Sequence, residues 1–366
     1  MKDLDKKINS SVKNGGKSGN ALSRRRLLKV LAAGGGAVAG TTLLPPKWVK
    51  PVVEFGALPL HAAVSPGGGP YAYITNYNSS NVSVINTATN TVIATVAVGQ
   101  SPRGVAVNPS GPFVYVANYG FNSVSVIDTA TNAVVATVAV GNGPTGVCLN
   151  PTGSRAYVTN YNSNNVSAID TATNTVIATI AVGTGPSGIA DPILVPLIGT
   201  RVYVANYGSS NVSVINTTTN TVIATVAVGT GPWGIAVNPA HTFVYAANYN
   251  SNNVSVIDTA TNTVVATIAV GNNPYGIAVN PAGTFVYVAN YISNDVYVIS
   301  TATNTVVGNI AVGSGPRGIA VNPAGTFVYV ANYGIDNVSV INTATNTVVA
   351  TIPVGTSPEA FGKFIS

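Results

Sequence analysis

The stretch Tyr203–Gly229 reads YVANYGSSNVSVINTTTNTVIATVAVG and contains no charged residue. Close copies of it recur along the chain, and an Asn-Tyr pair near the start of each copy marks the period. Successive pairs lie 42 residues apart, with one step of 46. The tyrosines of these pairs are Tyr77, Tyr119, Tyr161, Tyr207, Tyr249, Tyr291 and Tyr333. The chain therefore contains seven repeats, which account for nearly everything after residue 57.

Each repeat divides into four short segments rich in Val, Ile, Tyr and Thr, the residues typical of β-strands. In the sixth repeat these segments are GIAVN (276–280), TFVYVAN (284–290), DVYVIS (295–300) and TVVGNIAV (305–312). Turn-forming Gly, Pro and Asn separate them. Four-stranded antiparallel units of this length, repeated seven times, predict an all-β fold, a seven-bladed β-propeller.

Both ends of the repeat array carry a copy of the same element. Residues 59–66 match the opening of the other repeats, and residues 358–362 (PEAFG) begin a further opening with no blade behind it. A β-solenoid, the main alternative, usually has shorter coils and needs terminal caps. We therefore expect the C-terminal segment to join the first blade and close the ring, which leaves no open sheet edge. The sequence leaves open which end segment forms the innermost strand of that blade.

The four-residue words that end the second segment of each repeat carry a family resemblance. Residues 157–160 read YVTN, residues 73–76 read YITN, and several other repeats read YVAN. With the NVSVIDTATNTVVATIAVG that follows at 253–271, the chain resembles the YVTN-type β-propeller repeat family, which is related to archaeal surface-layer propellers. The resemblance covers roughly residues 58–366 and implies the propeller fold.

The positive charge of the chain is confined to its N-terminus. Residues 1–39 hold nine Lys and Arg against two Asp, whereas the rest holds seven basic and eight acidic side chains. The segment SRRRLLK at 23–29 resembles the twin-arginine export signature, with Arg24 and Arg25 as the pair. A short apolar run and an A-x-A-like cleavage site at 37–39 follow. We predict a signal peptide over 1–39, a linker over 40–57 and the propeller over 58–366.

This resemblance implies export of the folded protein to the periplasm or the cell surface. Whether the signal is cleaved after Ala39, cleaved later or kept as an anchor stays open, as does the type of host envelope. We expect a monomer that meets the membrane only through its export signal. Nucleic acid is not an expected partner, because the nearly neutral body lacks the clustered Lys and Arg that bind a phosphate backbone.

Few residues of the body are suited to acid–base chemistry. It holds two His, two Glu and six Asp, and Asp128, Asp170 and Asp258 occupy a repeat position that elsewhere holds Asn or Ser. Such exchange favours a turn role over chemistry. Metal-ligand and nucleophile motifs such as H-E-x-x-H and G-x-S-x-G do not occur in the sequence. We therefore predict no catalytic residue, no metal and no cofactor.

Two functions follow from this reading. The main expectation is an exported, non-catalytic propeller that binds a protein or an envelope polymer, or that serves as a structural module of the cell envelope. The alternative, which seven-bladed relatives suggest, is an enzyme of lactonase, hydrolase or lyase type that uses the mouth of the central channel.

The repeats differ most at the middle residue of the Pro-x-Gly turn that precedes the innermost strand. In a propeller these turns surround the mouth of the central channel, and blade order places Arg and aromatic residues on one arc. The opposite side carries the small residues Thr145 and Ser187. Aromatic and Arg side chains in a group are typical of a binding hot spot. The predicted binding face consists of Arg103, Trp233, Tyr275, Arg317 and Glu359, with Phe121, Ile292 and Ile335 from loops between second and third strands.

Overall fold

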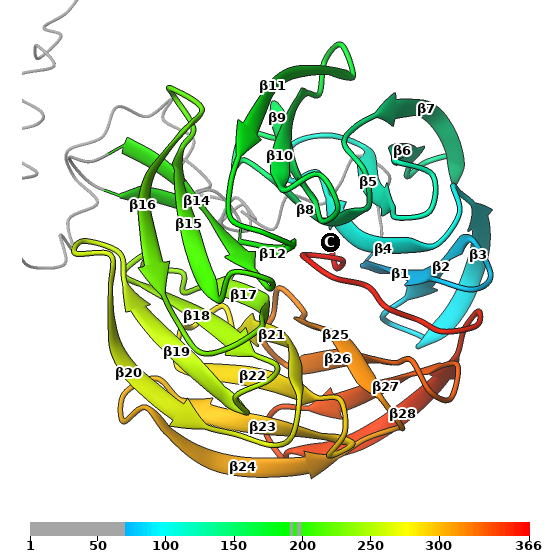
Figure 1. Cartoon of the computed structure of the whole chain (residues 1–366). Helices are drawn as coiled ribbons and strands as arrows, with labels where there is room; N and C mark the ends of the chain where they lie inside the picture. Colours follow the sequence, from blue (N-terminus) through cyan, green and yellow to red (C-terminus); the bar gives the residue numbers. More distant parts are fainter. Residues whose placement is uncertain (1–69, 191–192, 196–198) are drawn as a thin grey trace, which may run out of the picture. The chain divides into compact units, whose positions relative to one another are not determined.

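The computed structural model of the chain describes residues 70–190, 193–195 and 199–366. All regular elements of this part are β-strands, and they form seven antiparallel sheets arranged around a central axis (Figure 1). This confirms the predicted seven-bladed β-propeller. The predicted boundaries at residues 39 and 57, the export signal and the copy at 59–66 lie outside the described residues.

In each blade the strands follow one another from the axis outward. Blade 1 contains β1 (Tyr71–Asn76), β2 (Asn81–Asn86) and β3 (Thr91–Ala97). Blade 2 contains β4 (Pro102–Val107), β5 (Phe113–Asn118), β6 (Ser123–Asp128) and β7 (Ala133–Ala139). Blade 3 contains β8 (Pro144–Leu149), β9 (Arg155–Asn160), β10 (Asn165–Asp170) and β11 (Thr175–Ala181).

Blade 4 contains β12 (Pro186–Ile189), β14 (Gly199–Asn206), β15 (Asn211–Asn216) and β16 (Thr221–Ala227), with the additional β13 (Ile193–Val195) paired to β14. Blade 5 contains β17 (Pro232–Val237), β18 (Phe243–Asn248), β19 (Asn253–Asp258) and β20 (Thr263–Ala269). Blade 6 contains β21 (Pro274–Val279), β22 (Phe285–Asn290), β23 (Asp295–Ser300) and β24 (Thr305–Ala311). Blade 7 contains β25 (Pro316–Val321), β26 (Phe327–Asn332), β27 (Asn337–Asn342) and β28 (Thr347–Pro353).

The C-terminal segment completes blade 1 by lying along the inner edge of β1 with isolated β-bridges, and in Figure 1 it runs, in red, to the centre of the ring. The N–H of Tyr73 donates to the carbonyl of Phe364 at 2.9 Å, and the N–H of Glu359 donates to the carbonyl of Thr75 at 2.9 Å. The expected ring closure is confirmed. The structure also assigns the innermost position, which the sequence had left open, to the C-terminal copy.

One tyrosine of each repeat packs between neighbouring blades. These side chains, all buried, are Tyr73, Tyr115, Tyr157, Tyr203, Tyr245, Tyr287 and Tyr329. The hydroxyl of Tyr115 donates to Asn174 Oδ1 of the next blade at 3.3 Å. That of Tyr329, in the last blade, donates to Asn90 Oδ1 of the first blade at 3.1 Å. The same residue of the repeated word therefore joins successive blades and also the two ends of the ring.

The Asp residues that the sequence assigned to turns do hold turns together. Asp128 Oδ1 accepts hydrogen bonds from the N–H groups of Ala130 and Thr131, both at 2.9 Å. In blade 1, Asn86 Oδ1 accepts the same bond from Ala88 at 2.9 Å. The N–H of Thr131 helps to hold the pKa of Asp128 below its usual value, because it stabilises the ionised carboxylate. The predicted turn role is confirmed.

Neighbouring innermost strands approach each other most closely at the glycine of the Pro-x-Gly turn. A Cβ atom on Gly276 would overlap the carbonyl oxygen of Arg317 in the next blade, and one on Gly234 would overlap that of Tyr275. Glycine is therefore needed at this position for steric reasons. The close contact brings the variable middle residues of successive turns side by side around the axis.

This contact predicts that two Gly→Ala substitutions have very different effects on the free energy of unfolding. Gly276→Ala forces two backbones apart and should lower the free energy of unfolding by about 1–3 kcal/mol. Gly308→Ala is the matched control: its Cβ would meet Val298 at 3.4 Å, an ordinary contact, and Ala266 occupies the same position in blade 5. That variant should be neutral or slightly stabilised. Urea unfolding measures both; equal effects would contradict the steric role of Gly276.

The buried tyrosines predict a specific loss of stability in alkali. Burial raises the pKa of Tyr73 and of Tyr115 to about 12, and it also raises the pKa of Tyr203 and Tyr287. An unfolded tyrosine has a pKa of about 10. The fold therefore favours the neutral phenol: this contribution is complete below about pH 10 and is lost as the pH rises through about 12. The free energy of unfolding in urea should stay level to about pH 10 and then fall. A level profile up to pH 12 would contradict this assignment.

Candidate functional site

The structure brings five of the predicted binding residues together at one mouth of the central channel. Arg103, Trp233, Tyr275 and Arg317 each occupy the middle of a Pro-x-Gly turn, at the start of β4, β17, β21 and β25 respectively. Glu359 occupies the same position in the C-terminal segment. A proline restricts the backbone before each of these residues, and a glycine after four of them allows the turns to crowd together, whereas Ala360 follows Glu359.

Glu359 lies at the centre of this group, and its side chain is 0% exposed. Its Oε1 accepts a hydrogen bond from Arg317 Nη1 at 2.8 Å and another from the hydroxyl of Tyr275 at 3.1 Å. Arg103 Nε lies 3.7 Å from Oε2 on the other side. Two guanidinium groups, from blades 2 and 7, therefore share one buried carboxylate that belongs to the segment closing the ring. We call Arg103, Arg317 and Glu359 the Arg–Glu–Arg cluster.

A column of aromatic rings stands beside this cluster. The ring of Trp233 stacks on that of Tyr275 at 4.7 Å, and Tyr275 stacks in turn on Phe361 at 4.8 Å. Tyr275 is buried, whereas Trp233 is half-buried. The column was expected only in part: the turn position predicted Trp233 and Tyr275, but Phe361 was not singled out. The available signal was its place in the closing segment, two residues after the turn position that Glu359 occupies.

The Asn-Tyr tyrosines form a collar around the mouth. All seven are half-buried, and several adjacent rings lie about as far apart as Tyr77 and Tyr333, whose centroids are separated by 6.5 Å. Arg317 lies over the ring of Tyr333 at 3.5 Å, and Arg103 lies over the ring of Tyr119 at 3.9 Å. Such cation–π contacts fix the guanidinium groups from above. The sequence signal for this collar was the presence of the tyrosine in every repeat.

The other three predicted residues do not join the cluster. Phe121, Ile292 and Ile335 are 66%, 55% and 47% exposed. Ile292 directly follows a collar tyrosine, and Phe121 and Ile335 each lie two residues after one. Thr145 and Ser187, expected to form the plain side of the mouth, are buried. Ser187 Oγ donates to the carbonyl of Trp233 at 3.1 Å. The role of the eight residues as a binding face stays a prediction; the structure places five in a packed group and three on the surface.

Burial and charge act against each other in the cluster. Burial disfavours the Arg103 cation, but the Glu359 carboxylate is among the groups that more than offset this, so the pKa of Arg103 is raised. Burial, reinforced by Glu359, raises the pKa of Tyr275 well above its usual value. Both arginines therefore stay charged and Tyr275 stays a neutral donor. With Glu359 ionised, the cluster would carry one net positive charge.

Some polar atoms of the mouth make no hydrogen bond to any residue that the structure describes. They are Arg103 Nε, Arg317 Nε, Glu359 Oε2 and Trp233 Nε1, all buried. Buried donors and acceptors are normally paired. The arginine side chains are 14% and 16% exposed and that of Glu359 is 0% exposed, so the cluster meets solvent only through its arginines. Preorganised guanidinium donors can stabilise an oxygen that gains negative charge during a reaction.

In the described part of the chain, no group of three or more His, Cys, Asp or Glu side chains is placed to hold a metal ion. Nor does it contain a helix that could span a membrane.

The described part of the chain is thus a closed seven-bladed propeller with a preorganised charged cluster at one channel mouth. Comparison with known families shows a match to the model described as "Lactonase, 7-bladed beta-propeller" over residues 47–270 and 259–351. Since these matches cover most of the sequence, the chain belongs to this family of propellers.

Individual proteins resemble the chain in fold. Hydrazine synthase of Kuenenia stuttgartiensis has a TM-score of 0.68 and 25% identity, over 76% of this chain and 94% of that one. A functionally unknown protein from Desulfotomaculum acetoxidans has a TM-score of 0.66 and 18% identity, over 80% and 99%. The dihydro-heme d1 dehydrogenase NirN has a TM-score of 0.59 and 14% identity, over 77% and 63%.

One curated relative is similar over a short stretch. The PE-PGRS family protein PE_PGRS18 of Mycobacterium tuberculosis is 53% identical over 51 residues, which is 14% of this chain. The match spans only 11% of the length of that protein.

The family assignment corrects the main functional expectation. A non-catalytic binding or envelope module was expected because the body holds few acid–base residues, and that expectation is wrong. Membership of the lactonase family favours the alternative, an enzyme-type propeller. The physical reason for the error is that composition counts ionisable residues but does not locate them. Here the fold gathers two of the four arginines of the described residues, with the sole glutamate, at one point.

Proposed function

We propose that the protein is a hydrolase of the lactonase type, which opens a cyclic ester at the channel mouth that carries the Arg–Glu–Arg cluster. The observation that carries the proposal is the convergence of two guanidinium groups on one wholly buried carboxylate. Membership of the lactonase family supports the reaction class.

The chemistry required is the addition of water to the lactone carbonyl. Water adds to the carbonyl carbon, the ring C–O bond breaks, and the proton released passes to the departing ring oxygen, so that a hydroxy acid forms. The carbonyl oxygen becomes negative on the way, and fixed donors that face it lower the barrier. Arg103 and Arg317 are the donors suited to this task, because both remain charged and both reach solvent.

Glu359 acts in this proposal as a positioning residue. Its side chain is completely buried, so it touches the arginines and Tyr275 and not the solvent. The collar tyrosines Tyr119 and Tyr333 hold the outer sides of the two guanidinium groups. A substrate carbonyl oxygen would then meet donors that need not reorganise, which is the main source of electrostatic catalysis.

The test is hydrolysis of a panel of five- and six-membered lactones. The reaction is measured as the acid that it releases at constant pH. Arg317→Met should lower kcat/KM by about 100-fold to 1,000-fold, the usual loss on removing one oxyanion donor. Arg317→Lys keeps the charge but not the planar pair of donors and should retain part of the activity. Arg155→Met is the matched control, since Arg155 donates to the carbonyl of Thr217 and lies outside the cluster.

Because Arg317 also neutralises a buried carboxylate, folding of each variant has to be checked by its melting temperature. The proposal is wrong if folded wild-type protein turns over no lactone of the panel. It is also wrong if folded Arg317→Met is as active as the wild type.

We further propose that the repeats are of the YVTN type and that the twin-arginine route exports the protein to the periplasm or the cell surface. The literal YVTN at 157–160 supports the first point, and the SRRRLLK segment at 23–29 supports the second. The export segment lies outside the described residues.

Replacing both Arg24 and Arg25 by Lys should leave the precursor in the cytoplasm, because the twin-arginine route is read through that pair. Cell fractionation with an antibody against the propeller measures the distribution. Arg26→Lys is the control and should leave export intact. Unchanged export of the double variant would show that another route, or Arg26, suffices.

A further inference from the structure

The central channel contains a cavity of about 580 Å³ on the far side of the aromatic column. Phe361 lines this cavity, whereas Trp233 and Tyr275, the outer members of the column, do not. Phe361 is therefore the member of the column that faces the cavity, whereas Tyr275 stacks on it and donates to Glu359 of the Arg–Glu–Arg cluster. Exposed turn prolines, among them Pro109, Pro239 and Pro323, also line the cavity, so it opens to solvent at the other end of the channel.

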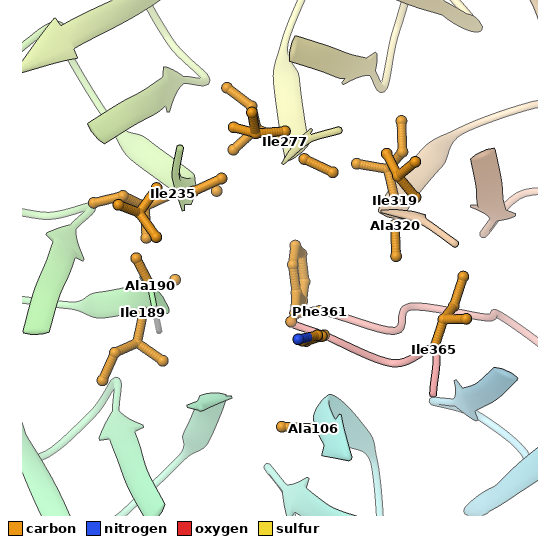
Figure 2. Close-up of a pocket in the computed structure, with 18 of the residues that line it drawn as sticks. Ala106, Ile189, Ala190, Ile235, Ile277, Ile319, Ala320, Phe361 and Ile365 are labelled. Carbon is orange, nitrogen blue, oxygen red and sulfur yellow. The ribbon is translucent and has the colours of Figure 1, made fainter. Parts of the chain in front are cut away.

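The wall of this cavity is apolar. Figure 2 shows isoleucines and alanines of the innermost strands facing a central space, with the ring of Phe361 projecting into it. The labelled isoleucines are Ile189, Ile235, Ile277, Ile319 and Ile365. Val237, Val279 and Val321 continue the wall and are only partly buried. An apolar cavity of this size with few polar groups has the properties of a small-molecule site.

Lys363 gives the cavity its charge. It is the only lysine among the described residues, its side chain is exposed, and it lines the cavity. Its backbone is held in place, since its carbonyl accepts a hydrogen bond from the N–H of Val107 at 3.0 Å. The lining residues include no Asp or Glu, and His241 is the only other ionisable side chain among them. The charge of this wall is therefore positive, and it comes from a single fixed position.

We propose that the channel binds a single-chain carboxylate, with the hydrocarbon chain in the apolar cavity and the carboxylate on the Lys363 ammonium group. The hydrocarbon chain of the ligand displaces water from the partly buried wall, and this displacement contributes favourably to the free energy of binding. The lone cation then selects an anionic head group over a neutral or cationic one. This site is distinct from the proposed active site, because none of Arg103, Arg317 and Glu359 lines the cavity.

The test uses isothermal titration of the full propeller with octanoate, decanoate and dodecanoate, all below their micelle concentrations. Kd should fall about fourfold for each added methylene, the free energy of burying one such group. Dodecanol and dodecylamine should bind more weakly than dodecanoate. Added salt should weaken dodecanoate binding but not dodecanol binding, because it screens the exposed ammonium group.

Variants test separately how the charge of Lys363 and the apolar cavity contribute to binding. Lys363→Met should weaken dodecanoate binding about threefold to fivefold, the size of a solvent-exposed ion pair, while Lys363→Arg should preserve it. Val279→Trp fills the cavity from a partly exposed wall position and should abolish binding without lowering the melting temperature by more than a few degrees. Arg317→Met is the control at the other mouth and should bind dodecanoate as the wild type does, whatever its effect on lactone hydrolysis.

Three results would overturn the proposal. Equal affinity of wild type and Lys363→Met for dodecanoate would show that no head group is recognised. Undiminished binding by folded Val279→Trp would place the ligand outside the channel. Binding to phosphatidylglycerol vesicles with no affinity for free dodecanoate would also refute it, because the occupant would then be a membrane lipid.

Discussion

The close approach of neighbouring innermost strands at the Pro-x-Gly turns is the constraint on which the rest of this structure depends. With no side chain at the glycine, one backbone can pack against the carbonyl of the next blade, as Gly276 does against Arg317. Seven blades can then surround a narrow axis. The same contact places the middle residue of every turn next to its neighbours, so residues 42 positions apart in the sequence share one small space.

Ring closure and site assembly are consequently the same event. Glu359 belongs to the C-terminal segment, yet its partners Arg103 and Arg317 belong to the second and the last blade. Until that segment pairs with β1, the two guanidinium groups lack their shared carboxylate. A buried carboxylate between two cations is stabilising only when its partners are in place. The chain therefore uses its last residues both to remove an open sheet edge and to complete its most strongly charged site.

The repeated and the variable residues have separate tasks. Tyr115 and its equivalents fill the space between blades, and the collar tyrosines surround the mouth, so these positions are the same in every repeat. The turn position carries most of the differences between repeats, and in the proposed function these differences provide the chemistry. Low overall charge therefore says little about local charge in a repeat protein, since the fold brings one arginine from each of two blades to the axis. The wrong expectation of a non-catalytic module came from interpreting the grouped Arg and aromatic residues only as a binding surface.

Much of the architecture was determined by the sequence alone, because its signals are local. The alternation of β-branched residues, the Asx turns at Asp128 and Asn86, and the spacing of the Asn-Tyr pairs predicted seven four-stranded blades. The sequence also predicted that the variable turn residues meet at one channel mouth, and five of the eight residues named for that face do so. Only the tertiary structure decided that Glu359 is fully buried between two arginines, that Phe121 stays exposed, and that the C-terminal copy takes the innermost position of blade 1. It alone revealed the apolar channel beside Lys363. Burial and cavity shape depend on how closely distant strands approach across the axis, a distance that no pattern within a repeat encodes.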